Sequence, residues 1–340
     1  MRAPERLKGL STLLALGLGL ALGAGLLVHV GFDRVLGLLA HARWWLVGLL
    51  PLHFVQIALT AAAWRAICPP GAPDLRTFIV ARWLREGVNS LLPVLPVAGL
   101  LAAIRMLVQS GLTLSRAVAA TLTDTTVELV SQIPFTLIGL VLLVTERGAG
   151  AVSAWMGVGL LVLCALAAFL VPAQRLGLAR IAERGARRLG WAGRIDGFDS
   201  ALAETQQSRR GLGFAAMQHL LAWLLGALEV WIALAALGHP IQAGPALAIE
   251  SLGHAIRAMA FVVPGALGVQ EGGFILVCGL FGVPPALGLA LSLVKRLRDV
   301  VFGVPSLALW MRMERRGGVA PRSASGEHSL PWSRPGTQSG

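Results

Sequence analysis

The stretch that decides the fold of this chain is Ala260–Gly273, which reads AFVVPGALGVQEGG. It lies in strongly apolar sequence, yet Pro264 lacks the backbone N–H that a helix needs, and its ring clashes with the preceding turn. In hydrocarbon an unsatisfied backbone group is costly, so such an interruption survives only where protein or a water-filled cavity surrounds it. The carboxylate of Glu271 lies beside it, so the stretch predicts a site inside a membrane. Its glycines can adopt backbone angles that other residues cannot; they are Gly265, Gly268, Gly272 and Gly273.

The composition is that of a polytopic membrane protein. Of the 340 residues, 56% are hydrophobic and only 14% are charged, which excludes both an ordinary soluble domain and a disordered chain. The formal net charge is +12, but the basic residues gather in a few loops and tails and are not interleaved with aromatics. This distribution favours membrane topology and contact with anionic lipid head groups, and no nucleic acid partner is expected.

The sequence carries no motif typical of a soluble enzyme. It contains no Walker loop, no His-Glu-x-x-His pair and no Gly-x-Ser-x-Gly elbow. The cysteines are scattered through apolar segments, with no metal-binding or disulfide spacing: Cys68, Cys164 and Cys278. We therefore expect no cofactor and no metal, and we do not expect an enzyme.

The apolar runs predict an all-α polytopic fold of about six full spans and two Pro/Gly-broken re-entrant hairpins. The hairpins are expected at 75–110 and 245–283, which are too interrupted for a clean span. The full spans are expected at 10–30, 44–67, 114–144, 151–171, 212–237 and 286–310.

These elements give one integral membrane domain over 1–316, made of two halves. An Arg-rich polar loop joins the halves and has the spacing of an interfacial amphipathic helix in its first part. The tail is rich in Ser, Pro and Gly and is expected to be disordered. The first half is 10–171, the loop 172–210, the second half 211–316 and the tail 317–340.

The distribution of basic residues predicts the orientation. The N-terminus, the Arg-rich loop and the C-terminal segment after the last span (311–340) carry 3, 8 and 5 basic residues, whereas the opposing loops carry two, one and none. By the positive-inside rule both termini and the large loop are expected to be cytoplasmic. This parity holds only if each hairpin enters and leaves the membrane on one side.

A fixed offset of 171 residues relates the two hairpins. It places Pro93 on Pro264 and Gly111 on Gly282. The first hairpin follows an outward-to-inward span and the second follows the reverse, which is the signature of an inverted-topology repeat. In transporters such repeats place the substrate site near the membrane midplane, although Pro and Gly are common here and the match per residue is weak.

Charged residues inside the predicted spans are the strongest functional signal. Asp124 and Glu128 lie four residues apart on one helical face, and Lys295 and Asp299 have the same spacing in the last span, next to Arg296. If the halves pack about a pseudo-two-fold axis, the acidic pair is expected to face the basic one. Such charges form either a structural network that locks helices or a polar pocket for a lipid head group or a proton relay.

A second polar group precedes the first interruption at Pro93. Arg82 and Glu86 lie four residues apart and suit a simple surface pair, whereas Arg85 and Asn89 could instead complete a guanidinium cluster for phosphate. In the second half, Glu250 and Arg257 lie seven residues apart on one helical face and are expected to form a structural pair.

These residues resemble the lysylphosphatidylglycerol-synthase transmembrane family of flippase-like membrane proteins, over about residues 10–315. The Pro-Gly-x-x-Gly-x-x-Glu element is the most specific part of the resemblance. Two further stretches are similar to the hopanoid-biosynthesis-associated branch of the family, Ala81–Val94 (ARWLREGVNSLLPV) and His219–Trp231 (HLLAWLLGALEVW). The general resemblance is carried by Phe261–Gly273, Phe281–Pro284 (FGVP) and Ser292–Asp299 (SLVKRLRD).

The resemblance implies a bacterial inner-membrane protein that moves or places a polycyclic triterpenoid lipid. In relatives an acid tends to follow a Gly-Gly pair after the first interruption, but this chain has Ala98, Gly99 and Leu100 there. A mechanism with two symmetric carboxylates is therefore in doubt, and Glu271 would act alone. Only a short tail follows the last span, so lysyl transfer is not expected. The positions that match the family are Pro264, Gly265, Gly268, Glu271 and Arg296.

The resulting expectation is a non-enzymatic lipid transporter whose ligand is a hopanoid or an anionic phospholipid. Its polar end is expected to contact Glu271, Asp124, Lys295 and Arg296 in a cavity between the hairpins. One alternative is a membrane scaffold or accessory subunit that partners lipid-biosynthesis proteins. A third is an intramembrane enzyme that uses Glu271 as general base.

Overall fold

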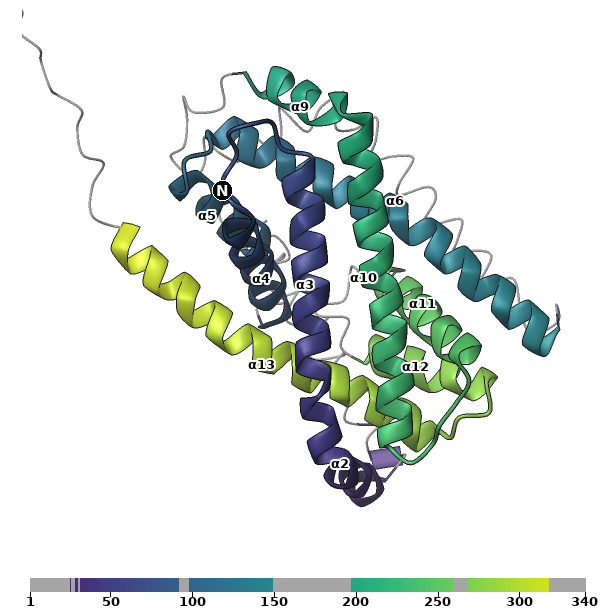
Figure 1. The fold of residues 1–340 in the computed structure, drawn as a ribbon. Coiled ribbons are helices and arrows are strands. Elements are labelled where there is room, and N and C mark those ends of the chain that lie inside the picture. Colours follow the sequence, from purple (N-terminus) through teal and green to yellow (C-terminus); the bar gives the residue numbers. More distant parts are fainter. Residues whose placement is uncertain are drawn as a thin grey trace, which may run out of the picture.

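The protein is a helical bundle in which every regular element that the structure describes is an α-helix (Figure 1). The computed structural model describes residues 25, 28, 29, 31–91, 98–148, 197–259 and 268–317. The expected spans at 10–30 and 151–171, most of the Arg-rich loop and the tail lie wholly or largely outside these residues. The helices are α2 (Phe32–Val47), α3 (Leu49–Ala66), α4 (Leu75–Leu91), α5 (Ala98–Gln109), α6 (Leu114–Arg147), α9 (Phe198–Gln207), α10 (Arg209–Ala236), α11 (Ala243–Met259), α12 (Val269–Leu280) and α13 (Pro285–Gly317).

Three long helices form the frame of the bundle. The expected spans at 114–144, 212–237 and 286–310 correspond to α6, α10 and α13, which have 34, 28 and 33 residues. At 1.5 Å per residue they are about 51, 42 and 50 Å long, which exceeds the roughly 30 Å hydrocarbon core of a bilayer. Of the helices described, α6 and α10 are long enough and apolar enough to cross a membrane. Because these helices exceed the bilayer core, each must tilt or extend beyond it.

The expected span at 44–67 is wrong at its start, because the chain there forms two helices. α2 ends at Val47, Gly48 makes a turn, and α3 begins at Leu49. The sequence contains the reason. Pro51 lies in the first turn of α3, where its missing N–H is tolerated, but it cannot donate to the carbonyl of Val47, so the preceding helix ends there.

Each predicted hairpin consists of two short helices. α4 and α11 have 17 residues each, and α5 and α12 have 12 each, or about 26 and 18 Å. A 12-residue helix cannot cross a bilayer core alone. In the first hairpin the two helices pack closely. The backbone N–H of Gly99 on α5 donates to Asn89 Oδ1 on α4 at 2.9 Å, and a Cβ at Gly99 would lie only 2.1 Å from the Arg85 carbonyl oxygen. The connections 92–97 and 260–267, with Pro93, Pro264 and Gly265, lie outside the described residues.

The two halves of the chain contain matching sets of helices. α5 and α12 begin 171 residues apart, as do α6 and α13, and both long helices carry an internal proline at that same offset, Pro134 and Pro305. Before the long helices, Gly111 and Gly282 both adopt positive φ, which favours glycine. α3 and α10 lie side by side in the centre, α4 packs on α13, and α11 packs on α6 (Figure 1).

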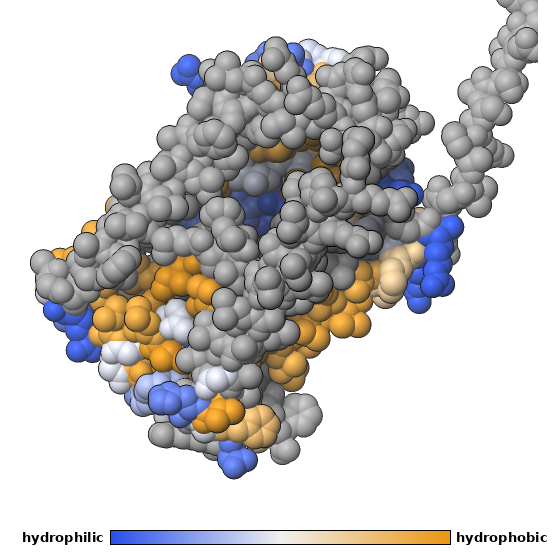
Figure 2. Space-filling model, turned by 180° about the vertical axis from the view of Figure 1, so that it is seen from behind, coloured by the Kyte–Doolittle hydropathy of each residue, from blue (hydrophilic) through white to orange (hydrophobic). Residues whose placement is uncertain are grey.

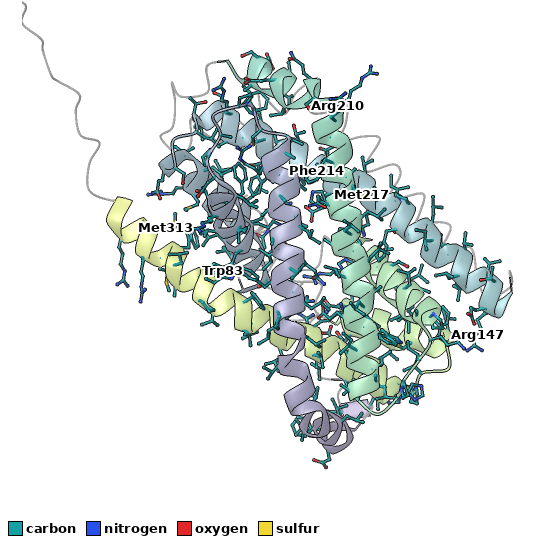
Figure 3. All side chains as sticks on the ribbon, in the orientation of Figure 1. Trp83, Arg147, Arg210, Phe214, Met217 and Met313 are labelled. Atoms are coloured by element: carbon teal, nitrogen blue, oxygen red, sulfur yellow. The ribbon has the colours of Figure 1, made fainter. Side chains whose placement is uncertain are left out.

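The surface is suited to lipid. Figure 2 shows broad orange, apolar areas, with blue residues at the ends of the molecule and in a hollow. On α10 the exposed side chains repeat every three or four residues and so form one stripe; Figure 3 labels the first two. The stripe consists of Phe214, Met217, Leu221, Leu224, Leu228 and Trp231. In a water-soluble protein such a stripe would be buried, so this face is expected to contact acyl chains.

Candidate functional site

A polar cavity of about 310 Å³ lies inside this apolar bundle. We call it the central cavity. It is lined by residues of α3, α4, α6, α10, α11 and α13, so both halves of the chain contribute to its wall. Its charged and histidine residues are Arg82, Arg85, Glu86, Glu128, Glu250, Arg257, Arg298, Asp299, His53 and His254. Four guanidinium groups thus face the same space as four carboxylates.

In the first half, two arginines of α4 bind two acids of α6. Arg85 donates to Asp124 Oδ2 and to Glu128 Oε2, both at 2.9 Å. Arg82 donates to Glu128 at 2.5 and 3.1 Å, lies 3.4 Å from Asp124, and also bonds Glu86 one turn along α4 at 2.6 Å. Asp124 is fully buried and Arg82 is 4% exposed. Buried charges need such partners, because an unpaired one pays a large desolvation penalty.

A histidine completes this cluster from the central helix α10. His219 is fully buried, and its Nε2 lies 3.0 Å from Asp124 Oδ1. Within the described part of the chain its Nδ1 has no hydrogen-bond partner. Sequence reasoning did not identify His219 as a site residue, since a single histidine in an apolar span carries no spacing signal. It could have been found only from the position of Asp124 in space.

In the second half, an acid of α11 binds a lysine of α13. Lys295 Nζ lies 2.9 Å from the Glu250 carboxylate, and His254, one turn further along α11, lies 3.2 Å from it. The expected pairing of Asp124 and Glu128 with the basic pair of the last span is therefore wrong. In each half, the first helix of the hairpin supplies the partner to the long helix that follows, so the opposite charges meet within a half.

A second cluster in this half joins α10, α11 and α13. Arg298 donates to Glu229 Oε2 at 2.5 Å and to Asp299 Oδ1 at 2.8 Å. Arg257 is 3.9 Å from Asp299, so the expected Glu250–Arg257 pair is also wrong, because Glu250 is occupied by Lys295. With a side chain that is 40% exposed, Arg257 is the cavity guanidinium with the longest ion pair among the described residues. It is therefore the most available to a ligand.

Glu271 and Arg296 form an ion pair away from the cavity lining. Glu271 lies in the first turn of α12, which begins after Gly268 in a positive-φ conformation (73°). A carboxylate there also interacts favourably with the helix dipole. Glu271 is 4% exposed, so this pair fastens the start of α12 to α13.

The predicted site residues thus fall into four groups. Arg85, Asn89, Glu128 and Asp299 line the cavity. Asp124 and Lys295 lie behind its wall and bind residues that line it. Glu271, Gly268 and Arg296 lie apart at the start of α12 and on α13. Pro93, Pro264 and Gly265 lie outside the described residues.

Other polar residues of the lining were not predicted. His53 and Gln56 project from α3 and bond one another at 3.0 Å, and His254 projects from α11. Within the described residues no group of three or more His, Cys, Asp or Glu side chains has the geometry to hold a metal ion. The site is therefore a set of ion pairs around a small polar volume. Chemically it can bind a polar group that carries charge, hydrogen-bond donors or hydrogen-bond acceptors.

The comparison with protein families adds to this geometry. A family model described as lysylphosphatidylglycerol synthase TM region matches residues 13–306. The chain belongs to this family. The match spans most of the chain and includes both hairpins, so the chain is a membrane protein of a family related to lipid metabolism. No curated protein and no solved structure matches it at the threshold of the comparison.

Proposed function

We propose that this protein is a non-enzymatic lipid transporter that moves the polar end of a membrane lipid through the central cavity. The observation that carries the proposal is the cavity itself, in which four arginines and four acids meet inside a largely apolar bundle. Each charge within a bilayer costs energy, and such residues usually mark a substrate or ion pathway. The polar end would contact Arg257 first, because this guanidinium is the one held least tightly by the protein.

The matched helices support an inverted-topology repeat with alternating access. The shared offset of α5 and α6 with α12 and α13, and the reciprocal packing of α4 on α13 and α11 on α6, fit two units related by a pseudo-two-fold axis. In transporters with such repeats, one unit rocks against the other around a site near the midplane. Here the central cavity lies between the units, so rocking would expose it to each side in turn.

The lipid is proposed to be a hopanoid, and the membrane a bacterial inner membrane with both protein termini in the cytoplasm. The ligand class rests on the likeness of Ala81–Val94 and His219–Trp231 to the hopanoid-associated branch. An anionic phospholipid is the competing ligand, because the cavity arginines would also bind phosphate. No cofactor is needed in this proposal, because the residues bind and release a lipid without changing a covalent bond.

One observation favours a second candidate function, that of a membrane scaffold for lipid-biosynthesis proteins. Most of the charged residues that line the cavity are already paired, at 2.5–3.4 Å, with opposite charges in the lining or behind it. A network in which most charges are already paired needs no ligand, and it is sufficient to lock the helices together. The two functions differ in one requirement: transport needs a lipid to enter and leave the cavity, whereas a scaffold does not.

Reconstitution separates the two functions. The protein is placed in vesicles that contain either a labelled hopanoid or a labelled phosphatidylglycerol in one leaflet, and redistribution between leaflets is followed. Arg257→Gln is expected to slow redistribution at least tenfold with an unchanged unfolding temperature, because its ion pair is long and exposed. Glu204→Gln, which removes the exposed Arg116–Glu204 pair outside the cavity, is the matched control and should keep the wild-type rate. A wild-type rate in Arg257→Gln, or no redistribution by the wild type, would favour the scaffold.

A further inference from the structure

A second, apolar hollow opens beside the central cavity. It has a volume of about 500 Å³, within the roughly 300–1,000 Å³ range of ligand pockets. We call it the side groove. It lies between α3, α4 and α13 and is lined by Leu50, Phe54, Arg76, Ile79, Val80, Trp83, Val301, Phe302 and Pro305. Among the described residues of this lining Arg76 is the one that is charged, so the groove is chemically the reverse of the central cavity.

The groove and the cavity are neighbours that share part of their walls. Trp83 and Phe302 line both of them. The indole N–H of Trp83, which is labelled in Figure 3, donates to the backbone carbonyl of Phe302 at 2.8 Å, and this hydrogen bond joins α4 to α13. This contact forms a partition between the two spaces: charged groups lie on the side of the central cavity, and hydrocarbon side chains lie on the side of the groove.

Two features of the groove indicate what occupies it. Phe54 and Val301 are 52% and 44% exposed, so the groove opens to the outside of the bundle, where an apolar helix surface meets acyl chains. Water gains few hydrogen bonds in such a lining, because a stable water site needs two to four polar partners. The hydrocarbon part of a membrane lipid therefore suits it best.

The position of Arg76 sets the orientation of that lipid. Arg76 lies in the first turn of α4, seven residues before Trp83, or about 10 Å along the helix axis. Its side chain is exposed at the end where α4 begins. A polar group attached to the hydrocarbon can thus remain beside Arg76, near the surface, while the body lies along α4 towards Trp83.

We infer that the side groove is a lateral binding site for the hydrocarbon body of an amphipathic lipid. The Trp83–Phe302 contact closes this site from the central cavity. The binding site stands on the groove alone, whereas the passage of the polar end past Trp83 rests on the proposed transport function. The shared chemistry of the ligand is a long hydrocarbon body with one polar end, which either a phospholipid or a polycyclic triterpenoid supplies.

The test is photo-crosslinking of the full-length protein in vesicles, with two probes in separate experiments. One probe is a phosphatidylglycerol with a diazirine in an acyl chain, and the other is a triterpenol with a diazirine in its ring system. Labelled peptides are located by mass spectrometry. Val301→Trp fills the groove from α13, and Val304→Trp is its matched control, because Val304 lies on the same helix, is 55% exposed and is not part of the groove. Val80→Trp fills the groove from α4, in case Val301→Trp fails to fold.

The inference expects one of the probes to label the α3 and α4 walls of the groove. Val301→Trp or Val80→Trp should reduce this label at least fivefold, while Val304→Trp leaves it unchanged. The probe that labels identifies the source of the hydrocarbon. Label spread evenly over the exposed faces of α6, α10 and α13, or label indifferent to Val301→Trp and Val80→Trp, overturns the site. Lost label with unchanged lipid redistribution overturns only the route into the cavity, whereas specific label without any redistribution by the wild type refutes transport and leaves the binding site standing.

Discussion

The two halves of the bundle share a framework but reverse the polarity of one buried ion pair between the hairpin helix and the long helix. α4, α5 and α6 have 17, 12 and 34 residues, and α11, α12 and α13 have 17, 12 and 33. In the first half the hairpin helix supplies a cation, Arg82, to an acid on the long helix, Asp124. In the second half the hairpin helix supplies an acid, Glu250, to a cation on the long helix, Lys295.

This difference shows that the framework accommodates a buried ion pair of either polarity at the junction of hairpin helix and long helix. Each of these pairs lies within its own half, so movement of one half against the other need not break it. At its edge the wall of the central cavity also differs between the halves. In the first half, α4 contacts α13 at Trp83, and the side groove stays open beside this contact. In the second half, α11 packs tightly against α6 at Ser251 and Gly139, where a Cβ on Gly139 would lie 1.8 Å from the serine hydroxyl.

The largest expected effect comes from breaking the second-half pair. Lys295→Met leaves the Glu250 carboxylate, 1% exposed, with His254 as its one remaining ionisable partner among the described residues. Removal of one partner of a buried ion pair typically costs about 3–5 kcal/mol, so the unfolding temperature in detergent should fall sharply. The double variant Glu250→Arg with Lys295→Asp gives this half the polarity of the first and should recover most of the loss. If the double variant is as unstable as Lys295→Met, charge polarity is fixed by the framework and the comparison fails.

The two hairpins should differ in their tolerance of a methyl group. In Gly99→Ala the new Cβ meets the Arg85 carbonyl at 2.1 Å, and backbone must move. In Gly273→Ala the nearest atom is Ile256 Cγ2 at 2.9 Å, on a side chain that can shift. Overpacking typically costs about 1–3 kcal/mol, so we expect a larger fall in unfolding temperature for Gly99→Ala. Equal falls in unfolding temperature for the two variants would contradict this difference and would mean that both hairpins accommodate the added methyl group equally well.

A smaller effect is expected when the partition beside the groove loses its hydrogen bond. Trp83→Phe keeps an aromatic ring but removes the donor to Phe302, at a cost of about 0.5–1.5 kcal/mol. If the partition limits entry, lipid redistribution should become about two- to fivefold faster. Trp231→Phe is the matched control, because the Trp231 indole also donates to a backbone carbonyl, that of Ile241 at 2.8 Å, and Trp231 lines neither the central cavity nor the side groove. A slower or unchanged rate in Trp83→Phe removes Trp83 from the entry route.

The smallest effect concerns the start of α4. Hydrogen bonds from the Thr77 hydroxyl and then from its backbone N–H to Asp74 Oδ1 lower the pKa of this carboxyl. Because the pKa is lowered in the folded state, the stabilisation is present above the unfolded value, near 3.9, and is lost as pH falls through the folded one. Asp74→Ala should therefore lower the unfolding temperature slightly at pH 7, and by less as the pH falls below the unfolded pKa and through the folded one. A pH-independent difference would show that the charge of Asp74 is not the cause.

The helices could be predicted where one property of the sequence decides them. Apolar runs place both bounds of α6 and α10 within about three residues and the start of α13 within one, although α13 continues seven residues past the expected end at 310. The break between α2 and α3 was missed, although Pro51 could have revealed it. Which residues pair could not be predicted, because helical spacing puts Asp124 and Glu128 on one face without showing that α4 would face it.

The sequence correctly indicated that charged residues form the polar interior. The partner of each charge could not be predicted, because it depends on packing between elements that are distant in the sequence. Arg82 and Asp124 are 42 residues apart, and Glu250 and Lys295 are 45 apart. Their separations along the chain carry no periodic signal. The side groove was harder still, since it is defined by an unfilled volume among three helices, and the apolar residues that line it look in the sequence like any lipid-facing positions.

The central claim is that the central cavity opens to each side of the membrane in turn, and the most direct test is chemical accessibility of a cavity residue. Ser90, which lines the cavity, is replaced by cysteine in a variant whose three native cysteines are serine or alanine. A membrane-impermeant thiol reagent is then applied to either side of oriented vesicles. The account predicts labelling from both sides, with labelling from one side slowed when the transported lipid is present. Labelling from one side only, whatever lipid is present, would contradict it.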